Sequence, residues 1–264
     1  MTKEIKISDS AVQDPWVDLK RFTRARIALG RVGSSLPTKE ILNFGMSHAM
    51  ARDAVHLALD EEALKIQIES LGCDVIRLHS RAPDRASYLL RPDWGRRLND
   101  QSAQLLIDQV KKSGDVSIVI GDGLSSLAVQ RHATPMLQAI LQSMPSHWKI
   151  GPVVIASQAR VALADEVGSL IKAQMVILLI GERPGLSSPD SLGLYLTYQP
   201  RVGCSDADRN CISNVRPEGL SYEAAARKLI WLTNESMRLK VSGVALKDES
   251  DVHQINNQES GFLS

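Results

Sequence analysis

The amino-acid sequence predicts an α/β fold in which a mostly parallel sheet carries helices on both faces and follows an N-terminal helical arm. From about residue 70, short runs rich in Val and Ile alternate with longer runs of helical periodicity. This alternation is typical of parallel strands joined by crossover helices. The runs at 118–120 and 176–180 are apolar at every position, which favours strands that are covered on both sides.

The segment before this domain has a different pattern. Residues 1–13 are polar and predict a loose arm, whereas residues 19–39 hold six Lys and Arg side chains and no acidic one. Gly, Ser and Pro in the second half of that stretch predict a loop. After Pro37, apolar residues recur at helical spacing and predict a helix with Thr38 as its N-cap. These residues are Ile41, Leu42, Met46, Met50, Ala54, Leu57 and Leu59.

The remaining elements follow from composition and periodicity in chain order. Strands are predicted at 73–78, 116–120, 152–156, 175–180 and 192–198. Helices are predicted at 94–112, 125–144, 163–173 and 223–239. We therefore divide the chain into an arm and helix at 1–69, an α/β domain at 70–246 and a polar tail at 247–264.

The composition excludes several classes of protein. Lys and Arg number 31 against 30 acidic residues, so the net charge gives no support for a nucleic-acid or membrane-surface partner. No stretch approaches the ~20 consecutive apolar residues of a membrane span, and the polar start argues against a secretory signal. The three cysteines, Cys73, Cys204 and Cys211, are too few for a disulfide framework and favour a reducing compartment.

Ligand-binding loops are expected beyond the carboxyl ends of parallel strands. Three loops take this position, at 121–125, 156–161 and 181–186. Their glycines allow close approach of a ligand to the backbone, but glycine also serves in tight strand-to-helix turns. The motifs G-x-G-x-x-G and G-x-x-x-x-G-K-[ST] are absent, so a nucleotide-phosphate site has no motif to support it.

Two side chains in or near such loops are candidates for ligand binding. Glu182 follows five apolar residues and a glycine, where its carboxylate can accept hydrogen bonds from a ligand or pair with Arg183. Cys211 lies in a polar stretch, which favours a packed thiol in a loop or a ligand contact over a nucleophile. The histidines and the pair Cys204 and Cys211 lack metal-ligand spacing, so we predict no metal site.

Five segments together resemble the light chain of bacterial ethanolamine ammonia-lyase. They are TRARIALGR at 23–31, YLLRPDWGRRL at 88–98, GDGLS at 121–125, GERPGL at 181–186 and DADRNCISN at 206–214. The short glycine motifs are weak separately. Five segments in this order, with predicted strands and helices between them, are specific, and the resemblance extends over residues 15–246.

The resemblance implies an activity, a cofactor and a partner. Enzymes of this family convert ethanolamine to acetaldehyde and ammonia by radical chemistry that depends on adenosylcobalamin. In the family the cofactor lies between a heavy chain, which holds the substrate, and a light chain with a Rossmann-like domain that is not active alone. Carried over by position, the light-chain contacts to cobalamin are Val161, Glu182 and Cys211. We expect the catalytic residues on the heavy chain and no cobalt ligand on this one.

Two other functions stay open beside this expectation. One is an assembly subunit that never contacts the cofactor, and the other is an independent Rossmann-type enzyme that binds a nucleotide. The basic stretch at 20–31, with Phe22 and Ile27 between its charges, is expected to dock on the heavy chain unless it is a solvated face. Some members of the family carry a long N-terminal extension that helps to deliver the enzyme to a bacterial microcompartment, whereas only about a dozen residues precede the resemblance here. We therefore expect a cytoplasmic location at least as much as enclosure in a microcompartment.

Overall fold

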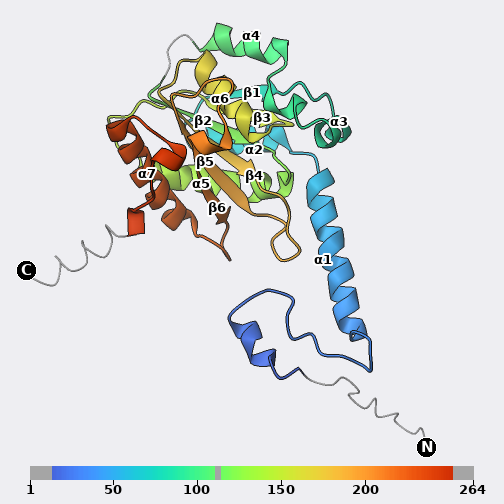
Figure 1. The fold of residues 1–264 in the computed structure, drawn as a ribbon. Helices are drawn as coiled ribbons and strands as arrows, with labels where there is room; N and C mark the ends of the chain where they lie inside the picture. Colours follow the sequence, from blue (N-terminus) through green and yellow to red (C-terminus); the bar gives the residue numbers. More distant parts are fainter. Residues whose placement is uncertain (1–13, 111–113, 252–264) are drawn as a thin grey trace, which may run out of the picture.

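The computed structural model describes residues 14–110 and 114–251, and Figure 1 shows its fold. Residues 1–13 and 252–264, which hold the predicted loose arm and most of the predicted polar tail, lie outside the described residues. So do residues 111–113, at the end of one predicted helix. No helix within the described ranges has the length and apolar character that crossing a membrane requires.

One sheet lies at the centre of the described residues, with the strand order β1-β3-β2-β4-β5-β6. The strands are β1 (Val75–His79), β2 (Val116–Gly121), β3 (Val153–Ser157), β4 (Met175–Gly181), β5 (Leu192–Tyr198) and β6 (Arg209–Val215). Strands β1 to β4 are parallel, and β5 is antiparallel to both of its neighbours. The prediction of a mixed α/β fold with a mostly parallel sheet is therefore confirmed. The Rossmann-like assignment stays a prediction.

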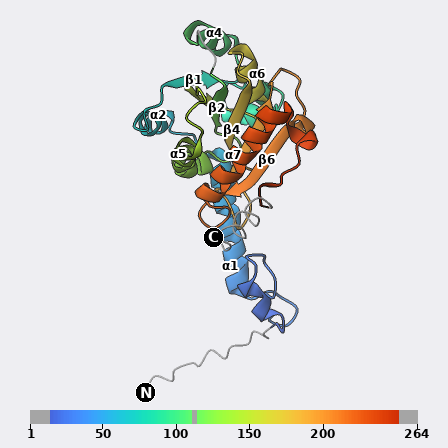
Figure 2. The ribbon, with the colours of Figure 1, turned by 90° about the vertical axis from the view of Figure 1, so that its left-hand side faces the viewer.

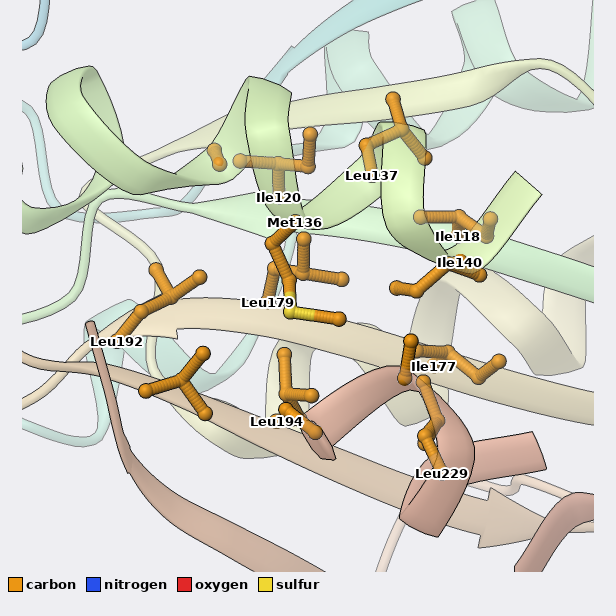
Figure 3. Close-up of a cluster of buried hydrophobic side chains, with 14 of the residues drawn as sticks. Ile118, Ile120, Met136, Leu137, Ile140, Ile177, Leu179, Leu192, Leu194 and Leu229 are labelled. Atoms are coloured by element: carbon orange, nitrogen blue, oxygen red, sulfur yellow. The ribbon is translucent and has the colours of Figure 1, made fainter. Parts of the chain in front are cut away.

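Helices cover both faces of the sheet, as predicted, and each face has its own apolar core. One face carries α2 (Glu61–Glu69), α5 (Ser126–Ser143) and α7 (Tyr222–Leu239), and the other carries α4 (Asp100–Gln109) and α6 (Val161–Leu170). Because side chains alternate along a strand, Ile118 and Ile120 join the α5 core while Val119 joins the α6 core. Figure 3 shows the α5 core.

Helix α1 (Thr38–His56) leaves this body and projects away from it, as the two views of Figures 1 and 2 show. Its one buried residue is Ala54. The arm before it contains the 3-10 turn η1 (Val17–Arg21), which buries no residue. The shorter elements α3 (Arg85–Leu90), η2 (Trp94–Arg96), η3 (Asp206–Asp208) and η4 (Gly243–Ala245) join the larger ones.

The helix expected to reach residue 59 ends three residues earlier, and a helix that was not predicted follows it. Helix α1 ends at residue 56, and Asp60 begins the separate helix α2 by accepting a hydrogen bond from the Ala63 amide at 3.0 Å. Leu64 and Ile68 of α2 are buried in the α5 core, so residues 61–69 pack with the α/β domain. Thr38 is not the N-cap, because Pro37 takes that position without a side-chain hydrogen bond.

The helix expected at 94–112 is divided into two elements. It consists of η2 followed by α4, whose N-cap Asn99 accepts a hydrogen bond from the Ser102 amide at 2.7 Å. The break has a tertiary cause, because the Leu98 amide donates to the carboxylate of Glu166 at 2.8 Å and the Asn99 amide to the carbonyl of His79 at 3.1 Å. Neither partner is close in the sequence.

Strand β6 and helix α3, like α2, were not predicted. Strand β6 includes Cys211, so the expectation that this residue lies in a loop is wrong. Only Arg209, Ile212 and Val215 of β6 are buried, and such a half-exposed edge strand lacks the apolar run that marked the central strands. Helix α3 is only six residues long, and its N-cap Asp84 accepts from the Ser87 amide at 2.7 Å.

Candidate functional site

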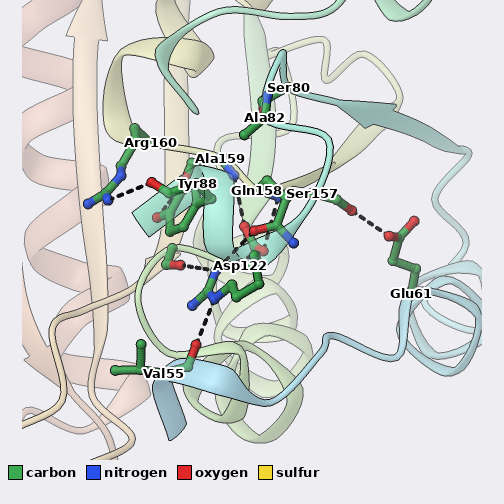
Figure 4. Close-up of polar contacts among 12 residues, drawn as sticks. Val55, Glu61, Ser80, Ala82, Tyr88, Asp122, Ser157, Gln158, Ala159 and Arg160 are labelled. Carbon is green, nitrogen blue, oxygen red and sulfur yellow. Dashed lines mark hydrogen bonds and ion pairs between the residues drawn. The ribbon is translucent and has the colours of Figure 1, made fainter. Parts of the chain in front are cut away.

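The loop between β3 and α6 is held by Asp122, which follows β2. Its buried carboxylate accepts hydrogen bonds from the amides of Gln158 at 3.0 Å and Ala159 at 2.8 Å, as Figure 4 shows. Burial raises the pKa of this carboxyl, and the amides together with Arg85, 3.4 Å away, oppose the rise. Gln158 has a φ of 52°, an uncommon conformation for a side-chain-bearing residue, and the bond to Asp122 stabilises it.

Arg160 and Val161 begin α6 and are positioned by Tyr88. The Tyr88 hydroxyl donates to the Ala159 carbonyl at 3.1 Å, and the Arg160 guanidinium lies 4.2 Å from the centroid of the Tyr88 ring. The Arg160 amide donates to the Gly95 carbonyl at 2.8 Å. These contacts give the first turn of α6 a defined place beside the strand ends.

A hollow of about 440 Å³ lies next to this turn, and we call it the β4 hollow. It is lined by residues from α3, the loop after β2, the start of α6, the end of β4 with the loop that follows it, and strands β5 and β6. Val161, Glu182, Tyr195 and Ser213 are among its lining residues. The structure therefore brings together two of the three residues expected to contact the cofactor.

Glu182 lies directly after β4 and joins that strand to β6. Its carboxylate accepts hydrogen bonds from the Ser213 hydroxyl and from the Asn214 amide, the latter at 3.1 Å. Its own amide donates to the Ser191 carbonyl at 3.0 Å. The partners of this side chain are thus groups of β6 and not Arg183, the alternative that the sequence left open.

The glycines of the strand-end loops serve backbone packing. A Cβ on Gly181 would lie 2.0 Å from the Ser125 carbonyl oxygen, and one on Gly123 would lie 2.2 Å from the Gly181 carbonyl oxygen. Gly123 also has a φ of +59°, which favours glycine. These contacts support the interpretation that the two glycines serve tight strand-to-helix turns, in which the backbone of one loop lies against that of another.

The family model described as ethanolamine ammonia-lyase light chain (EutC) matches residues 13–247. The chain belongs to the ethanolamine ammonia-lyase light-chain family. It is 54% identical over 256 residues to the ethanolamine ammonia-lyase small subunit of Pseudomonas syringae pv. tomato, covering 96% of this chain and 89% of the relative. It is 54% identical over 255 residues to that of Azotobacter vinelandii, covering 95% and 94%.

Membership of this family makes the chain a subunit of a lyase, and a small subunit implies a larger partner subunit. In this light chain, Cys211 pairs with Tyr195 across β5 and β6, and the Tyr195 side chain lines the β4 hollow. Burial and the nearby negative charge of Glu182 raise the pKa of the Cys211 thiol, against a hydrogen bond with Tyr195 that lowers it. A raised thiol pKa does not suit a nucleophile. Because Cys211 is exposed, it is not the packed thiol that the sequence offered as one interpretation, and its contact with a ligand stays a prediction.

Several residues of the light-chain site were not singled out from the sequence. Asp122 and Tyr88 lie in segments that carry the family resemblance, but their roles depend on Gln158 and Ala159, which are distant in sequence. Two signals in the sequence could have pointed to them. Asp122 stands between two glycines after a buried strand, and a buried Tyr such as Tyr88 usually needs a hydrogen-bond partner. Ser213, the partner of Glu182, lies in the strand that was not predicted.

Proposed function

We propose that this light chain forms one wall of an adenosylcobalamin site, with the heavy chain as the other wall, in an enzyme that converts ethanolamine to acetaldehyde and ammonia. One observation carries the proposal. Val161 and Glu182, 21 positions apart, line the same hollow at the strand ends, and Cys211 lies beside it through its pairing with Tyr195. Such a crevice is where ligands bind in open α/β sheets.

The β4 hollow fits a part of the cofactor and not the whole of it. A volume of about 440 Å³ suits a drug-sized ligand, and a corrinoid with its nucleotide is larger. The remaining surface of the cofactor therefore requires a second protein surface, which is consistent with a small subunit that works beside a larger one. When bound, adenosylcobalamin supplies radical chemistry that amino-acid side chains do not.

The residues of this chain bind and orient the cofactor in our proposal. Each oxygen of Glu182 takes one hydrogen bond from β6, and a carboxylate oxygen has a further lone pair. A neutral carboxamide on the rim of the corrinoid can donate to it in a charge-assisted bond. Val161 supplies apolar contact that excludes water from the same side. The residues that act on ethanolamine belong to the heavy chain, so the light chain alone is inactive.

The proposal is tested by the change Glu182→Gln in the complex of light and heavy chains. Loss of the charged acceptor is expected to weaken cobalamin binding by about tenfold. Glu69→Gln, on the exposed side of α2, is the matched control and should bind cobalamin like the wild type. Normal affinity with a lowered melting temperature would show that Glu182 only joins β4 to β6. A heavy chain that is fully active by itself would instead identify this chain as an assembly subunit.

We further propose that the arm and α1 contact the heavy chain. Five large apolar side chains of α1 are exposed, namely Ile41, Leu42, Phe44, Met46 and Met50, and Trp16 and Phe22 of the arm are exposed as well. Apolar surface of this extent, interleaved with arginines, is typical of an interface. Positions 42 and 46 share one face of the helix by their spacing.

Co-purification with the heavy chain tests this contact. The double change Leu42→Glu and Met46→Glu, and separately the deletion of residues 1–35, are expected to reduce the amount of heavy chain recovered. Ile66→Glu, at an exposed apolar position of α2, is the control for adding a charge to a helix surface. Equal recovery with all of these variants would assign the arm and α1 to a solvated face.

A further inference from the structure

We propose that a second hollow beside the first is a phosphate site, which takes the phosphodiester of the nucleotide loop of the cofactor. The second hollow has a volume of about 600 Å³, and we call it the arginine hollow. Four arginines line it, namely Arg96, Arg97, Arg160 and Arg209. The inference rests on the proposed cofactor wall, because the two hollows share Arg160 and Val161.

Two of the four arginines are already neutralised by carboxylates. Arg97 binds Glu166 through two hydrogen bonds of 3.0 and 2.8 Å. Arg209 donates to Asp165 at 3.1 and 2.5 Å and to Asp206 at 2.7 Å. Both acidic side chains that line the hollow, Glu166 and Asp206, are therefore engaged in these pairs.

The other two arginines have no carboxylate at ion-pair distance in the described part of the chain. Arg160 contacts the ring of Tyr88 and donates to the Tyr88 carbonyl at 3.3 Å, neither of which carries a charge. Its Nε atom is buried and lacks a hydrogen-bond partner there. Arg96 is exposed, and the nearby Asp93 is bound by Arg91 through two hydrogen bonds. The arginine hollow thus carries an excess of positive charge.

This excess of positive charge selects an anion, and guanidinium groups match the oxygens of a phosphate. The start of α6 adds backbone amides, because its N-cap residue provides no side-chain hydrogen bond. The two hollows then bind chemically different parts of the cofactor. The β4 hollow presents a carboxylate to neutral carboxamides of the corrinoid rim, and the arginine hollow presents cations to the anionic phosphodiester. Free phosphate has the same chemistry and is the alternative source of the ligand.

The test compares two corrinoids in the complex of light and heavy chains. Cyanocobalamin carries the nucleotide loop, and cobinamide lacks that nucleotide and its phosphate. Equilibrium dialysis should show that Arg96→Gln weakens binding of cyanocobalamin by about tenfold and changes binding of cobinamide by less than about twofold. Arg160→Gln should act in the same direction. Arg227→Gln, an exposed arginine of α7 outside both hollows, is the control for loss of one positive charge.

Each outcome decides a separate point. If Arg96→Gln weakens the binding of both corrinoids equally, or changes the binding of neither, the phosphate site is overturned. Because Arg96 is exposed, this variant is expected to fold. A wild-type complex that binds neither corrinoid overturns the proposed cofactor wall instead. Competition of inorganic phosphate with cyanocobalamin, but not with cobinamide, supports the nucleotide loop as the source. Phosphate binding to a complex already saturated with cyanocobalamin overturns that source and assigns the site to free phosphate.

Discussion

Helices α1 and α5 are nearly equal in length and differ in almost everything else. Helix α1 has 19 residues and buries only Ala54, whereas α5 has 18 residues and buries eight of them against the sheet and α7. Helix α5 begins with a Ser125 side-chain cap, and α1 begins at Pro37 without one. Since most helical stability in proteins comes from packing, α5 is stabilised within this chain. Helix α1 carries apolar side chains that nothing in the described residues covers fully.

The same substitution in the middle of each helix gives the largest expected difference. Met136 of α5 is fully buried, and Met46 of α1 is 65% exposed. Met136→Ala should lower the free energy of unfolding of the isolated light chain by about 2–5 kcal/mol. Met46→Ala should change it by less than about 0.5 kcal/mol. Urea denaturation of both variants measures this difference, and equal losses would mean that α1 is packed in the isolated chain.

The helix caps provide the next test of the comparison. The hydroxyl of Ser125 accepts from the Ala128 amide at 3.2 Å and donates to the Pro189 carbonyl at 2.8 Å. Ser125→Ala should therefore cost about 1–2 kcal/mol of stability. Thr38→Ala at the start of α1 removes no cap and should change stability by less than about 0.5 kcal/mol. A comparable loss for the two variants, measured by thermal unfolding, would contradict the assignment of the caps.

The buried histidine of α5 gives the smallest expected effect, which is on the dependence of stability on pH. Burial lowers the pKa of His132 in α5, and Asp190 and Glu218 oppose this shift while Arg131 adds to it. The unfolded chain then binds more protons than the folded one as the pH falls below about 6.5. His132 thus contributes stability above this pH that is lost as the pH falls through its lower folded pKa.

Stability measured between pH 7.5 and 5 tests this sign. His132→Gln should make the fall in stability toward acid shallower, by at most about 1.4 kcal/mol per pH unit, the limit for one proton. An unchanged slope for His132→Gln, or a steeper one, would contradict the effect of burial on this residue.

The site residues that were predicted and those that were missed differ in the kind of signal that they leave in the sequence. The predicted residue has a local signal, whereas the missed ones depend on partners that are distant in the sequence. Glu182 was found because it follows the apolar strand β4 directly, and this is a local signal. Its partner Ser213 lies 31 positions later in β6, a strand that forms by pairing with β5. The role of Asp122 depends on the amides of residues 158 and 159. The sequence indicates that Asp122 follows a strand, but it does not indicate these hydrogen bonds.

The sequence by itself determined the alternation of strands and helices, the five strands β1 to β5 and the family. These features depend on residues that are neighbours in the chain, where burial on both faces and helical periodicity leave a local pattern. Only the tertiary structure decided that α2 packs with the α/β domain, that β6 completes the sheet, and that Val161 and Glu182 share one hollow. It also decided which arginines of the arginine hollow lack a carboxylate partner among the described residues. Such contacts join residues that are distant in sequence, so their formation depends on the folded arrangement of the whole sheet and not on any local pattern.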